Sequence, residues 1–481
     1  MKAETRNGES FDLVVIGAGA AGLVTASGAG MLGARTALIE KHRFGGECLW
    51  TGCVPSKALI RSAQTLHDAR NAAEVGLTST EISFEFGKIM QSMRGVIARI
   101  EPHDAPETIQ RRGVTTIQGA ATIPKPGQVK VNDQLLSTKR IVIATGSRPI
   151  VPPVANLEKT GYLTHESILE LDRRPSELIV LGAGPIGLEF AQVFNRFGTR
   201  VTVVELMDTI LPREDAELSD QLRQAMEREG VRFLLGHKAI GAARKNGTRE
   251  LLLERSSGAT TSISGDEILV ATGMRPHTES LKLENAGVEI DGRGAVRVDS
   301  KLRTTARGIW AAGDVTGKLF FTHVADYQAR LLVRNMFFPI RGRADYSRVP
   351  WATFTDPTLA HVGLTESEAR ERFGSRIGVY RYSLSDLDRA ITDRARTGMV
   401  KLITDSRGRL LGGHILGNHA DALIHQIALA MYAGVKIGAL SQMVHAYPTW
   451  PEGVRRTADS YYREKLAGGW IPKLLRWWVK R

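Results

Sequence analysis

An α/β fold containing two copies of one strand–turn–helix unit is predicted by two observations. The segment FDLVVIGAGAAGLV (11–24) is a β-branched apolar run that ends in a glycine turn followed by small residues, and LIVLGAGPIGLEFA (178–191) repeats this pattern. In each copy the next predicted strand ends in a glutamate, Glu40 in TALIE and Glu205 in VTVVE. Repetition of a strand, a glycine turn and a helix indicates two doubly wound domains, each built on a parallel sheet.

The glycine spacing of both turns matches the G-x-G-x-x-G fingerprint of dinucleotide-binding sites. Such glycines allow a tight turn and let the backbone approach a pyrophosphate, whose charge then lies at a helix N-terminus. The acid at the end of the next strand can bind the hydroxyls of a ribose. One such turn is weak evidence, but two copies with two acids predict two bound dinucleotides. The glycines are Gly17, Gly19 and Gly22 in the first turn and Gly182, Gly184 and Gly187 in the second.

A second repeated motif follows each fingerprint. RIVIATGSRP (140–149) and EILVATGMRP (267–276) both have the pattern of a strand that runs into a turn. We expect these turns to lie beside the nucleotides, which makes Thr145, Gly146 and Gly273 candidate cofactor-binding residues.

The two cysteines of the chain, Cys48 and Cys53, stand together in GGECLWTGCVPSK (45–57). A structural disulfide is disfavoured because closing so short a loop constrains the unfolded chain little. No other cysteine or clustered histidine completes a zinc site, so we expect no metal ligands here and favour redox chemistry. Pro55 suits the first turn of a helix. This places Cys53 at a helix N-terminus, where a thiolate is stabilised, and Cys48 in the preceding loop as the more accessible thiol.

Composition and charge limit the setting of this chemistry. The start, MKAETRNGES, has no apolar segment, and no apolar span of about 18 residues occurs, which indicates a cytoplasmic protein. Paired thiols in that compartment stay reduced unless they are catalytic or bind a metal. Lysine and arginine exceed the acids by 13, which suggests an anionic partner or surface. Nucleic acid is disfavoured because no recognition motif accompanies this charge.

Together with GIWAAGDVTG (308–317) and HAYPTWPEG (445–453), these motifs resemble the pyridine nucleotide-disulfide oxidoreductases of the dihydrolipoamide dehydrogenase, glutathione reductase and mercuric reductase type. The resemblance runs from about residue 11 to about residue 460. It implies two Rossmann-like dinucleotide-binding domains plus a C-terminal α+β dimerisation domain, and hence a homodimer. The implied boundaries are 1–150 for the FAD-binding domain, 151–276 for the NAD(P)-binding domain, 277–346 for a central domain that returns to FAD, and 347–481 for the dimerisation domain.

The resemblance assigns FAD to the first glycine turn, with Glu40 on its ribose and Asp314 on its ribityl and phosphate region. A plain helix cap is the alternative for Asp314. Electrons would pass from the nicotinamide through the flavin to the disulfide of Cys48 and Cys53.

In that scheme Cys53 faces the flavin and Cys48 attacks the substrate. Lys57 would reach the flavin edge and pair with Glu189, although a solvated helix lysine is the alternative. Glu47 and Trp50 depart from the residues common in the family, Thr and Asn, and should alter access to the interchange thiol.

The electron donor is expected to be NADH rather than NADPH. Glu205 would accept hydrogen bonds from both ribose hydroxyls and repel a 2′-phosphate. No lysine or arginine follows it before Arg213. Pro185 stands where several relatives place an aromatic residue that covers the flavin.

The C-terminal motif separates the reactions that the family catalyses. Tyr447 stands where lipoamide and glutathione enzymes have an acid–base histidine, with Glu452 five residues later. A phenol, with a reference pKa of about 10, is a poor proton shuttle at neutral pH. Mercuric reductases also have tyrosine here, but they typically carry a second cysteine pair near the C-terminus, which this chain lacks. His445 is an alternative acid–base residue, or a structural histidine.

The final segment, WIPKLLRWWVKR (470–481), has the character of a basic amphipathic helix. Such an end suits a bilayer interface and would place the protein at the inner face of the membrane. A helix packed on its own dimer is the alternative. The apolar stripe comprises Ile471, Leu474, Leu475 and Trp478, and the bases off that stripe are Lys473, Arg476 and Lys480.

The predicted function is therefore an FAD-dependent NAD(P)H oxidoreductase that passes electrons through Cys48 and Cys53 to a disulfide or a thiophilic metal ion such as Hg(II). A dihydrolipoyl dehydrogenase and a peripheral NADH:quinone reductase that uses the flavin directly are the alternatives. A non-catalytic NAD(H)-binding sensor is a further alternative.

Overall fold

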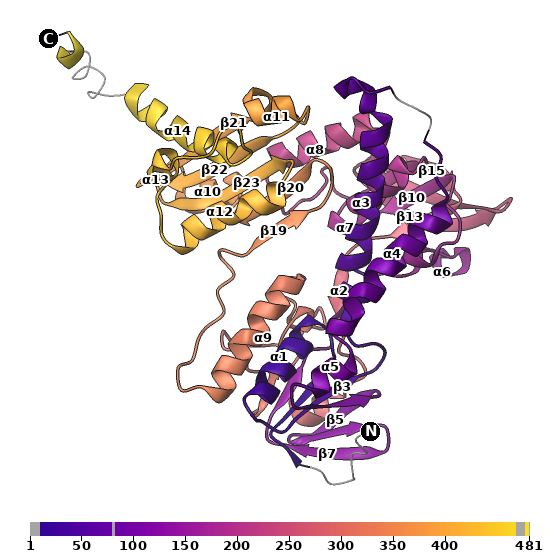
Figure 1. Ribbon diagram of the computed structural model, residues 1–481. Coiled ribbons are helices and arrows are strands. Elements are labelled where there is room, and N and C mark those ends of the chain that lie inside the picture. The colour runs from indigo at the N-terminus through magenta and orange to yellow at the C-terminus, as the bar shows by residue number, and fades with distance from the viewer. Residues whose placement is uncertain (1–9, 79–81, 468–476, 481) are drawn as a thin grey trace.

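The structure of the protein, a computed structural model, describes residues 10–78, 82–467 and 477–480. Its first domain is built on a five-stranded sheet in which every pairing is parallel (Figure 1). The outer strand β18 comes from residues 277–346 and thus returns to this sheet late in the chain. In sheet order the strands are β18 (Ile309–Ala311), β8 (Ile141–Ile143), β2 (Leu13–Ile16), β3 (Thr36–Glu40) and β4 (Val114–Gln118).

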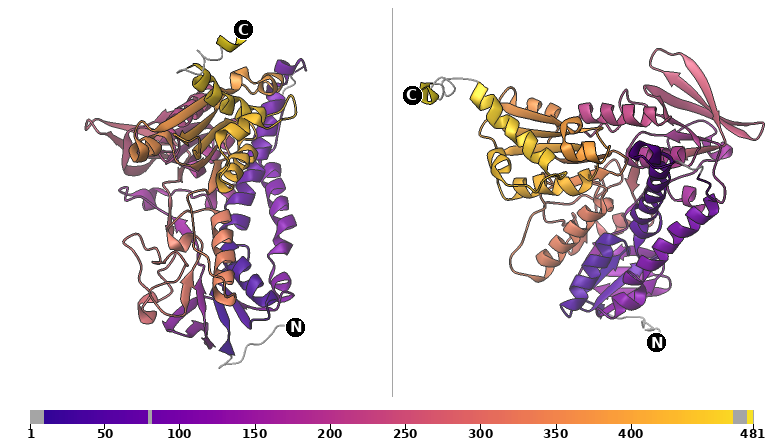
Figure 2. Two further views of the ribbon diagram at one scale, coloured as in Figure 1. Left: turned by 90° about the vertical axis from the view of Figure 1, so that its left-hand side faces the viewer. Right: turned by 45° about the horizontal axis from the view of Figure 1, so that its top comes forward.

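Both faces of this sheet are buried, which explains why its strands are continuous apolar runs. Leu13 and Val15 pack with α1 (Ala20–Met31) and α9 (Thr322–Phe337), which lie side by side on one face (Figures 1 and 2). Val14 and Ile16 face a second, four-stranded sheet. That sheet comprises β1 (Ser10–Phe11), β7 (Gln134–Thr138), β6 (Gln128–Val131) and β5 (Ala121–Lys125).

Two long helices leave the first domain and pack on the second. Helices α3 (Cys53–Arg70) and α4 (Phe86–Ile100) pack against each other, and α3 also packs on α7 (Pro185–Arg196). The N-terminal end of α3 therefore lies at the junction of the two domains. The shorter helices of this region are α2 (Gly46–Trp50), α5 (Pro106–Gln110) and α6 (Leu157–Thr160).

The second domain repeats the plan of the first. Its four-stranded parallel sheet lies between α7 and a three-stranded antiparallel sheet, so that Leu178 and Val180 face the helices while Ile179 and Leu181 face the other sheet. The parallel strands are β12 (Arg232–Leu234), β11 (Arg200–Val204), β10 (Glu177–Leu181) and β16 (Glu267–Val270). The antiparallel strands are β13 (His237–Lys245), β14 (Thr248–Arg255) and β15 (Thr260–Gly265).

The two ATG motifs pair with each other where the chain crosses between these domains. Strand β9 (Ser147–Pro149) and strand β17 (Met274–Pro276) form a two-stranded antiparallel sheet. The chain's two crossings between the nucleotide domains are thus held together by backbone hydrogen bonds.

The C-terminal domain is a five-stranded antiparallel sheet with helices packed against it (Figure 1). Helix α8 (Ala216–Arg228) of the second domain also contacts this sheet (Figure 2). The strands in sheet order are β19 (Pro350–Thr353), β20 (Thr358–Gly363), β23 (Leu410–Gly417), β22 (Met399–Asp405) and β21 (Ile377–Ser383). The helices are α10 (Glu366–Phe373), α11 (Asp388–Thr392), α12 (Ala420–Tyr432), α13 (Ile437–Gln442) and α14 (Glu452–Ala467).

The described part of the chain also contains short 3₁₀ helices. They are η1 (Ala72–Val75), η2 (Glu101–His103), η3 (Ser167–Glu170), η4 (Leu283–Ala286), η5 (Asp314–Thr316) and η6 (Leu384–Asp386). The predicted fold class, two Rossmann-like domains followed by an α+β domain, is confirmed.

Candidate active site and cofactor sites

The first and third glycines of each fingerprint occupy positions where no side chain fits. Gly17 has φ +101°, and a Cβ there would lie 2.4 Å from the carbonyl oxygen of Ala144. Gly182, with φ +110°, would meet Ala271 in the same way at 2.5 Å. A Cβ on Gly22 or Gly187 would clash with the carbonyl oxygen of the first glycine of its own turn. Both turns therefore depend on glycine for the backbone path and for helix–strand packing.

The second glycine of each turn is open. A Cβ on Gly19 would have its nearest neighbour at 3.8 Å, and one on Gly184 would meet nothing within 4 Å. Each begins a helix as its N-cap residue, and no side chain caps either helix. The residues present therefore fit a pyrophosphate at each helix N-terminus.

The two acidic residues are held in the same way in both domains. Glu40 accepts the backbone N–H of Ala18 at 2.7 Å and that of His42 at 2.7 Å. Glu205 accepts the N–H of Ala183 at 2.7 Å and that of Met207 at 3.0 Å. Each carboxylate is thus fixed between the glycine turn and the loop after its strand, where a ribose would lie.

The ATG turns adopt the strained backbone that their glycines allow. Gly146 has φ +69° and Gly273 has φ +115°. The Thr145 hydroxyl donates to the carbonyl oxygen of His277 at 2.6 Å, and that of Thr272 donates to Ile150 at 2.8 Å. Each threonine therefore ties one interdomain crossing to the other.

Asp314 begins η5 and bonds across to the first ATG turn. Its Oδ2 accepts the hydroxyl hydrogen of Ser147 at 2.7 Å, and its side chain does not cap the 3₁₀ helix. Burial raises the pKa of Asp314 to about 7, against the lowering effect of the Ser147 hydrogen bond. The carboxyl is therefore positioned beside the first nucleotide site rather than serving as a helix cap.

Cys53 is the first residue of α3, as predicted, and both cysteines are free thiols. A hydrogen bond from Cys48 lowers the pKa of Cys53 to about 6 and raises that of Cys48. The hydroxyl of Thr322, 3.3 Å from the Cys53 sulfur, and the charge of Lys57 lower the Cys53 pKa further. Cys53 is thus the thiolate of the pair, at the positive end of a helix.

The expected placement of Cys48 in an accessible loop is wrong. Cys48 lies inside α2, a one-turn helix, and is partly buried, whereas Cys53 is exposed. The difference arises because Leu49 anchors α2 in the core, where it is 2% exposed, while Cys53 stands at the open end of α3.

Lys57 and Glu189 form an ion pair that joins the first two domains. The Lys57 Nζ lies 2.9 Å from Oε2 of Glu189, whose side chain is 7% exposed. The other carboxylate oxygen accepts the N–H of Phe354 at 2.9 Å, and the Lys57 Nζ lies 4.4 Å from the centre of the Phe354 ring. Lys57 is therefore held one helical turn beyond Cys53. These contacts do not fit the alternative, a surface lysine surrounded by solvent.

A scan against family models matches residues 11–329 to "Pyridine nucleotide-disulphide oxidoreductase" and residues 349–458 to the dimerisation domain of the same family. The chain belongs to this family. Its members are flavoproteins that depend on FAD and a pyridine nucleotide, so the chain is an oxidoreductase, and the family that the motifs resemble is confirmed.

Curated relatives and solved structures span nearly all of this oxidoreductase. A mercuric reductase of Lysinibacillus sphaericus is 32% identical over 459 residues, which cover 95% of this chain and 84% of the relative. A dihydrolipoyl dehydrogenase of Corynebacterium glutamicum is 34% identical over 460 residues, which cover 94% and 97%. The structure titled Cu(II) complex of the HOCl-induced flavoprotein disulfide reductase RclA from Escherichia coli matches with TM-score 0.84 and 29% identity, over 94% of this chain and 99% of that one.

In the C-terminal motif of this oxidoreductase, Tyr447 is 68% exposed, and its hydroxyl donates to Asp388 at 3.0 Å. The Asp388 carboxylate raises the pKa of the Tyr447 phenol. Glu452 is buried and pairs with Arg455 at 3.0 Å. In the described part of the chain, the contacts of both side chains lie within the C-terminal domain.

His445 uses both of its ring nitrogens. Its Nδ1 lies 3.0 Å from the carbonyl oxygen of Met443, and its Nε2 lies 3.1 Å from the side-chain nitrogen of Gln426. These contacts fit the alternative of a structural histidine.

Glu47 and Trp50, the two residues expected to alter access to the thiols, both have partners. Oε1 of Glu47 lies 3.0 Å from Nε2 of His165, which is 3% exposed. The Trp50 indole donates to the carbonyl oxygen of Phe44 at 2.7 Å, and the Arg43 guanidinium lies over its ring. Pro185 is the first residue of α7, where its missing N–H is not needed.

Three residues of the site escaped the sequence analysis. Thr322, Phe354 and His165 lie far along the chain from the residues that they contact. No spacing rule links any of them to its partner, because each pair joins segments that are far apart in the sequence.

Among the described residues, no helix combines the length and apolar character needed to cross a bilayer. Most of the predicted amphipathic tail, namely residues 470–476 and 481, lies outside the described residues. Within its described part, Trp478 and Val479 are exposed to 71% and 85%.

Proposed function

We propose that the protein is an NADH-dependent flavoprotein reductase that delivers two electrons through Cys48 and Cys53 to a thiophilic metal ion such as Hg(II). The observation that carries this proposal is the thiol pair at the start of α3, with Cys53 as thiolate and Lys57 fixed by Glu189 one turn away. When bound, FAD passes electrons from the nicotinamide ring to this pair. The similarity of the chain to proteins named mercuric reductase supports the proposed acceptor.

The residues of the thiol pair divide the work. Reduction of their disulfide takes up two electrons, with Cys53 left as the thiolate that Thr322 and Lys57 stabilise. Cys48, whose raised pKa keeps its proton until a metal ion displaces it, supplies the second sulfur ligand. The balanced turnover converts NADH and Hg(II) into NAD⁺, Hg(0) and one proton, and it restores the disulfide.

Tyr447 favours a metal ion over an organic disulfide as the acceptor. A disulfide substrate needs a proton for its leaving thiolate, and Tyr447, with a raised phenol pKa, is a poor donor. A metal ion needs no proton because the thiolates are its ligands. In the proposed homodimer, Tyr447 and Glu452 of one protomer approach Cys48 of its partner.

NADH is the proposed donor because of Glu205. Its carboxylate is fixed by Ala183 and Met207 at the end of β11, and the loop that follows carries Leu206, Met207 and Asp208 but no base. A 2′-phosphate would meet negative charge without a compensating cation.

A dihydrolipoyl dehydrogenase is the second candidate, favoured by identities of up to 34% with such enzymes. An acceptor panel separates the candidates: NADH oxidation is followed anaerobically with Hg(II), lipoamide, glutathione disulfide and a quinone, for the wild type and Cys53→Ser. We expect Hg(II) turnover that is lost in Cys53→Ser. Robust lipoamide turnover would assign the second candidate, and quinone turnover that survives the substitution would assign direct reduction by the flavin.

We also propose a cytoplasmic protein whose tail, residues 470–481, contacts the membrane surface. The exposed Trp478 and the basic composition of the tail support this. Truncation after Gly469 should abolish co-sedimentation with anionic liposomes while NADH oxidation is retained. Equal sedimentation of the two forms would assign the tail to the protein's own dimer.

A further inference from the structure

One row of side chains crosses the C-terminal sheet on the face that meets the second domain. The strand register places Trp351 opposite His361, His361 opposite His414, and His414 opposite Lys401. Lys401, 2% exposed, is neutralised by carboxylates that surround its Nζ at 2.7–3.0 Å. They belong to Asp215, Glu217 and Glu366. His361 and His414, in the same row, are also buried, with exposed fractions of 1% and 0%.

Backbone carbonyl groups fix the tautomer of both histidines. Nε2 of His361 lies 2.9 Å from the oxygen of Gly363, and Nε2 of His414 lies 3.0 Å from that of Leu364. A carbonyl oxygen only accepts, so each Nε2 is the donor of its hydrogen bond, and in a neutral ring Nδ1 is then the nitrogen that can bind a metal ion. Proteins orient metal-binding imidazoles in this way, with the second nitrogen donating to a carbonyl or carboxylate group.

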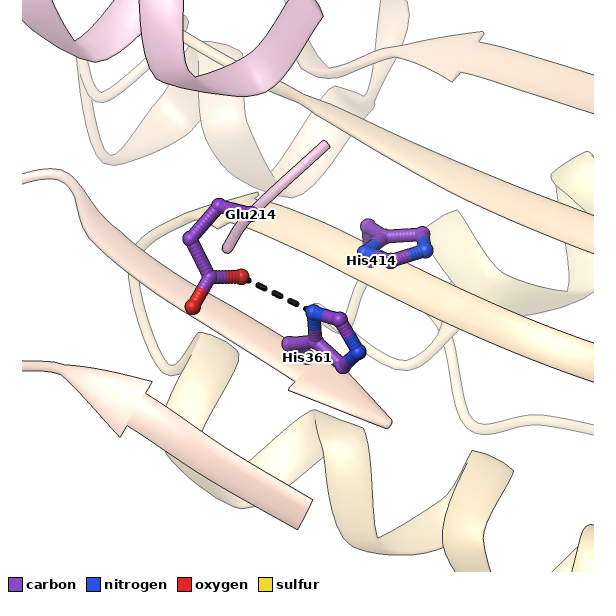
Figure 3. A group of neighbouring side chains, drawn as sticks. All are labelled: Glu214, His361 and His414. Atoms are coloured by element: carbon purple, nitrogen blue, oxygen red, sulfur yellow. Dashed lines mark hydrogen bonds and ion pairs between the residues drawn. The ribbon is translucent and has the colours of Figure 1, made fainter. Parts of the chain in front are cut away.

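The two Nδ1 atoms and the Glu214 carboxylate lie close together. Nδ1 of His361 lies 3.0 Å from Oε2 of Glu214, and either a hydrogen on Nδ1 or a cation bound by both atoms can occupy this contact. Nδ1 of His414 is buried and has no hydrogen-bond partner among the described residues. One ligand atom from each of the three residues lies within 4.8 Å of the others, and Figure 3 shows the three side chains as neighbours, with the contact between Glu214 and His361 dashed. A cation between them would satisfy all three.

We propose that Glu214, His361 and His414 form a binding site for a divalent transition-metal ion, with zinc as the best match. Two imidazoles and one carboxylate suit Zn²⁺, whose bonds to nitrogen and oxygen are about 2.0–2.2 Å. Tetrahedral ligands at that distance are about 3.3 Å apart. The Glu214–His361 pair, at 3.0 Å, is nearly at this spacing, and the three ligand atoms, which lie within 4.8 Å of one another, would close around the ion. Water fills the fourth position.

A pocket of about 520 Å³ lies next to the residues that surround the proposed site. Its lining includes Trp351, which stacks on His361 with ring centres 4.0 Å apart, and the two residues whose carbonyl groups fix the histidines. The Trp351 indole also donates to the other oxygen of Glu214, which orients the carboxylate.

The bound ion would join two domains. Glu214 precedes α8 in the second domain, whereas His361 and His414 belong to β20 and β23 of the C-terminal domain. Its expected effect is therefore on the stability of the domain junction and not on electron transfer at the cysteines.

Zinc binding is tested in the FAD-loaded Cys48→Ser/Cys53→Ser protein, so that the thiols cannot bind the ion. After dialysis against dipicolinate, we expect calorimetry with ZnCl₂ to give one ion per chain, and zinc to raise the melting temperature in proportion to the logarithm of its concentration. X-ray absorption at the zinc edge should show two imidazoles. Fewer than about 0.2 ions per chain, or a spectrum without imidazole, would overturn the proposal.

Variants locate the site. Glu214→Gln and His361→Asn should each weaken zinc binding by more than about 100-fold, since even residues that only support ligands contribute about 10–100-fold. The matched control His103→Asn, an exposed histidine, should bind zinc as the parent does. Bound-FAD absorbance reports the folding of each variant, and the titration and X-ray absorption spectrum of the Cys48→Ser/Cys53→Ser parent still test the proposal if a variant does not fold. Unchanged zinc binding in a folded His361→Asn protein would overturn the assignment. A melting temperature that changes with pH but not with zinc concentration would also overturn it.

Discussion

The carboxylate of Glu47, the residue directly before Cys48, lies 3.0 Å from Nε2 of the buried His165. Its negative charge raises the pKa of Cys53 and that of Asp314. One carboxylate thus contributes to the electrostatics of both the thiol pair and the carboxyl group of Asp314.

Replacing Glu47 by Gln should lower the pKa of Cys53 below its value of about 6, because it removes a negative charge that opposes the thiolate. In the two-electron-reduced, FAD-loaded enzyme, the thiolate-to-flavin absorbance band should then persist to lower pH than in the wild type. Glu74→Gln, at an exposed position in η1, is the matched control. A band that titrates at the same pH in wild type and variant would contradict the role given to Glu47.

Replacing Lys57 by Met should have the opposite effect on the thiol. The Lys57 charge lowers the pKa of Cys53, so its loss should shift the band to higher pH. The variant also leaves the buried Glu189 carboxylate without its cation, at a cost of about 1–3 kcal/mol. Lys57→Met/Glu189→Leu should recover stability but not the low thiol pKa. Lys88→Met, which breaks an exposed pair with Glu85, should change neither quantity appreciably. Recovery of the thiol pKa in the double variant would exclude a direct effect of Lys57.

Replacing Glu205 by Ala should lower kcat/KM for NADH by about tenfold or more, because the variant loses hydrogen bonds between the ribose and a charged group. The ratio of kcat/KM for NADH to that for NADPH should therefore fall. Asp208→Asn removes an exposed carboxylate from the same loop and serves as the control. The donor assignment fails if the wild type has the higher kcat/KM with NADPH.

Replacing Tyr447 by His should create lipoamide reductase activity. A positioned acid–base group is worth about 10²–10⁴ in rate, and the wild-type phenol is held by Asp388 with a raised pKa. The gain should follow a pH profile with a histidine-like pKa, while Tyr162→His in the second domain should give no gain. High lipoamide activity in the wild type would show that another group already donates the proton.

The motifs predicted the parts of the site that local backbone geometry determines. Gly17 and Gly182 had to be glycine because a carbonyl oxygen lies where a Cβ would be, and Pro55 set the start of α3 at Cys53. The helical placement of Cys48 was missed because α2 is a single turn, too short to show periodicity.

Contacts between distant segments had no sequence signal. Glu214 and His361 are 147 residues apart, and they meet only because α8 and the C-terminal sheet pack together. The partners of Glu47 and Cys53 likewise come from other elements, which a spacing pattern within one segment does not reveal.

The pairing of β9 with β17 has a mechanical consequence. If the two chain segments that cross between the nucleotide domains were not paired, each of them could bend without the other. Because Arg148 and Arg275 face each other in a hydrogen-bonded ribbon, torsion applied to one crossing is transmitted to the other. A change in the angle between the two nucleotide domains would therefore twist both crossings together, and this coupling comes from the backbone and not from any side chain.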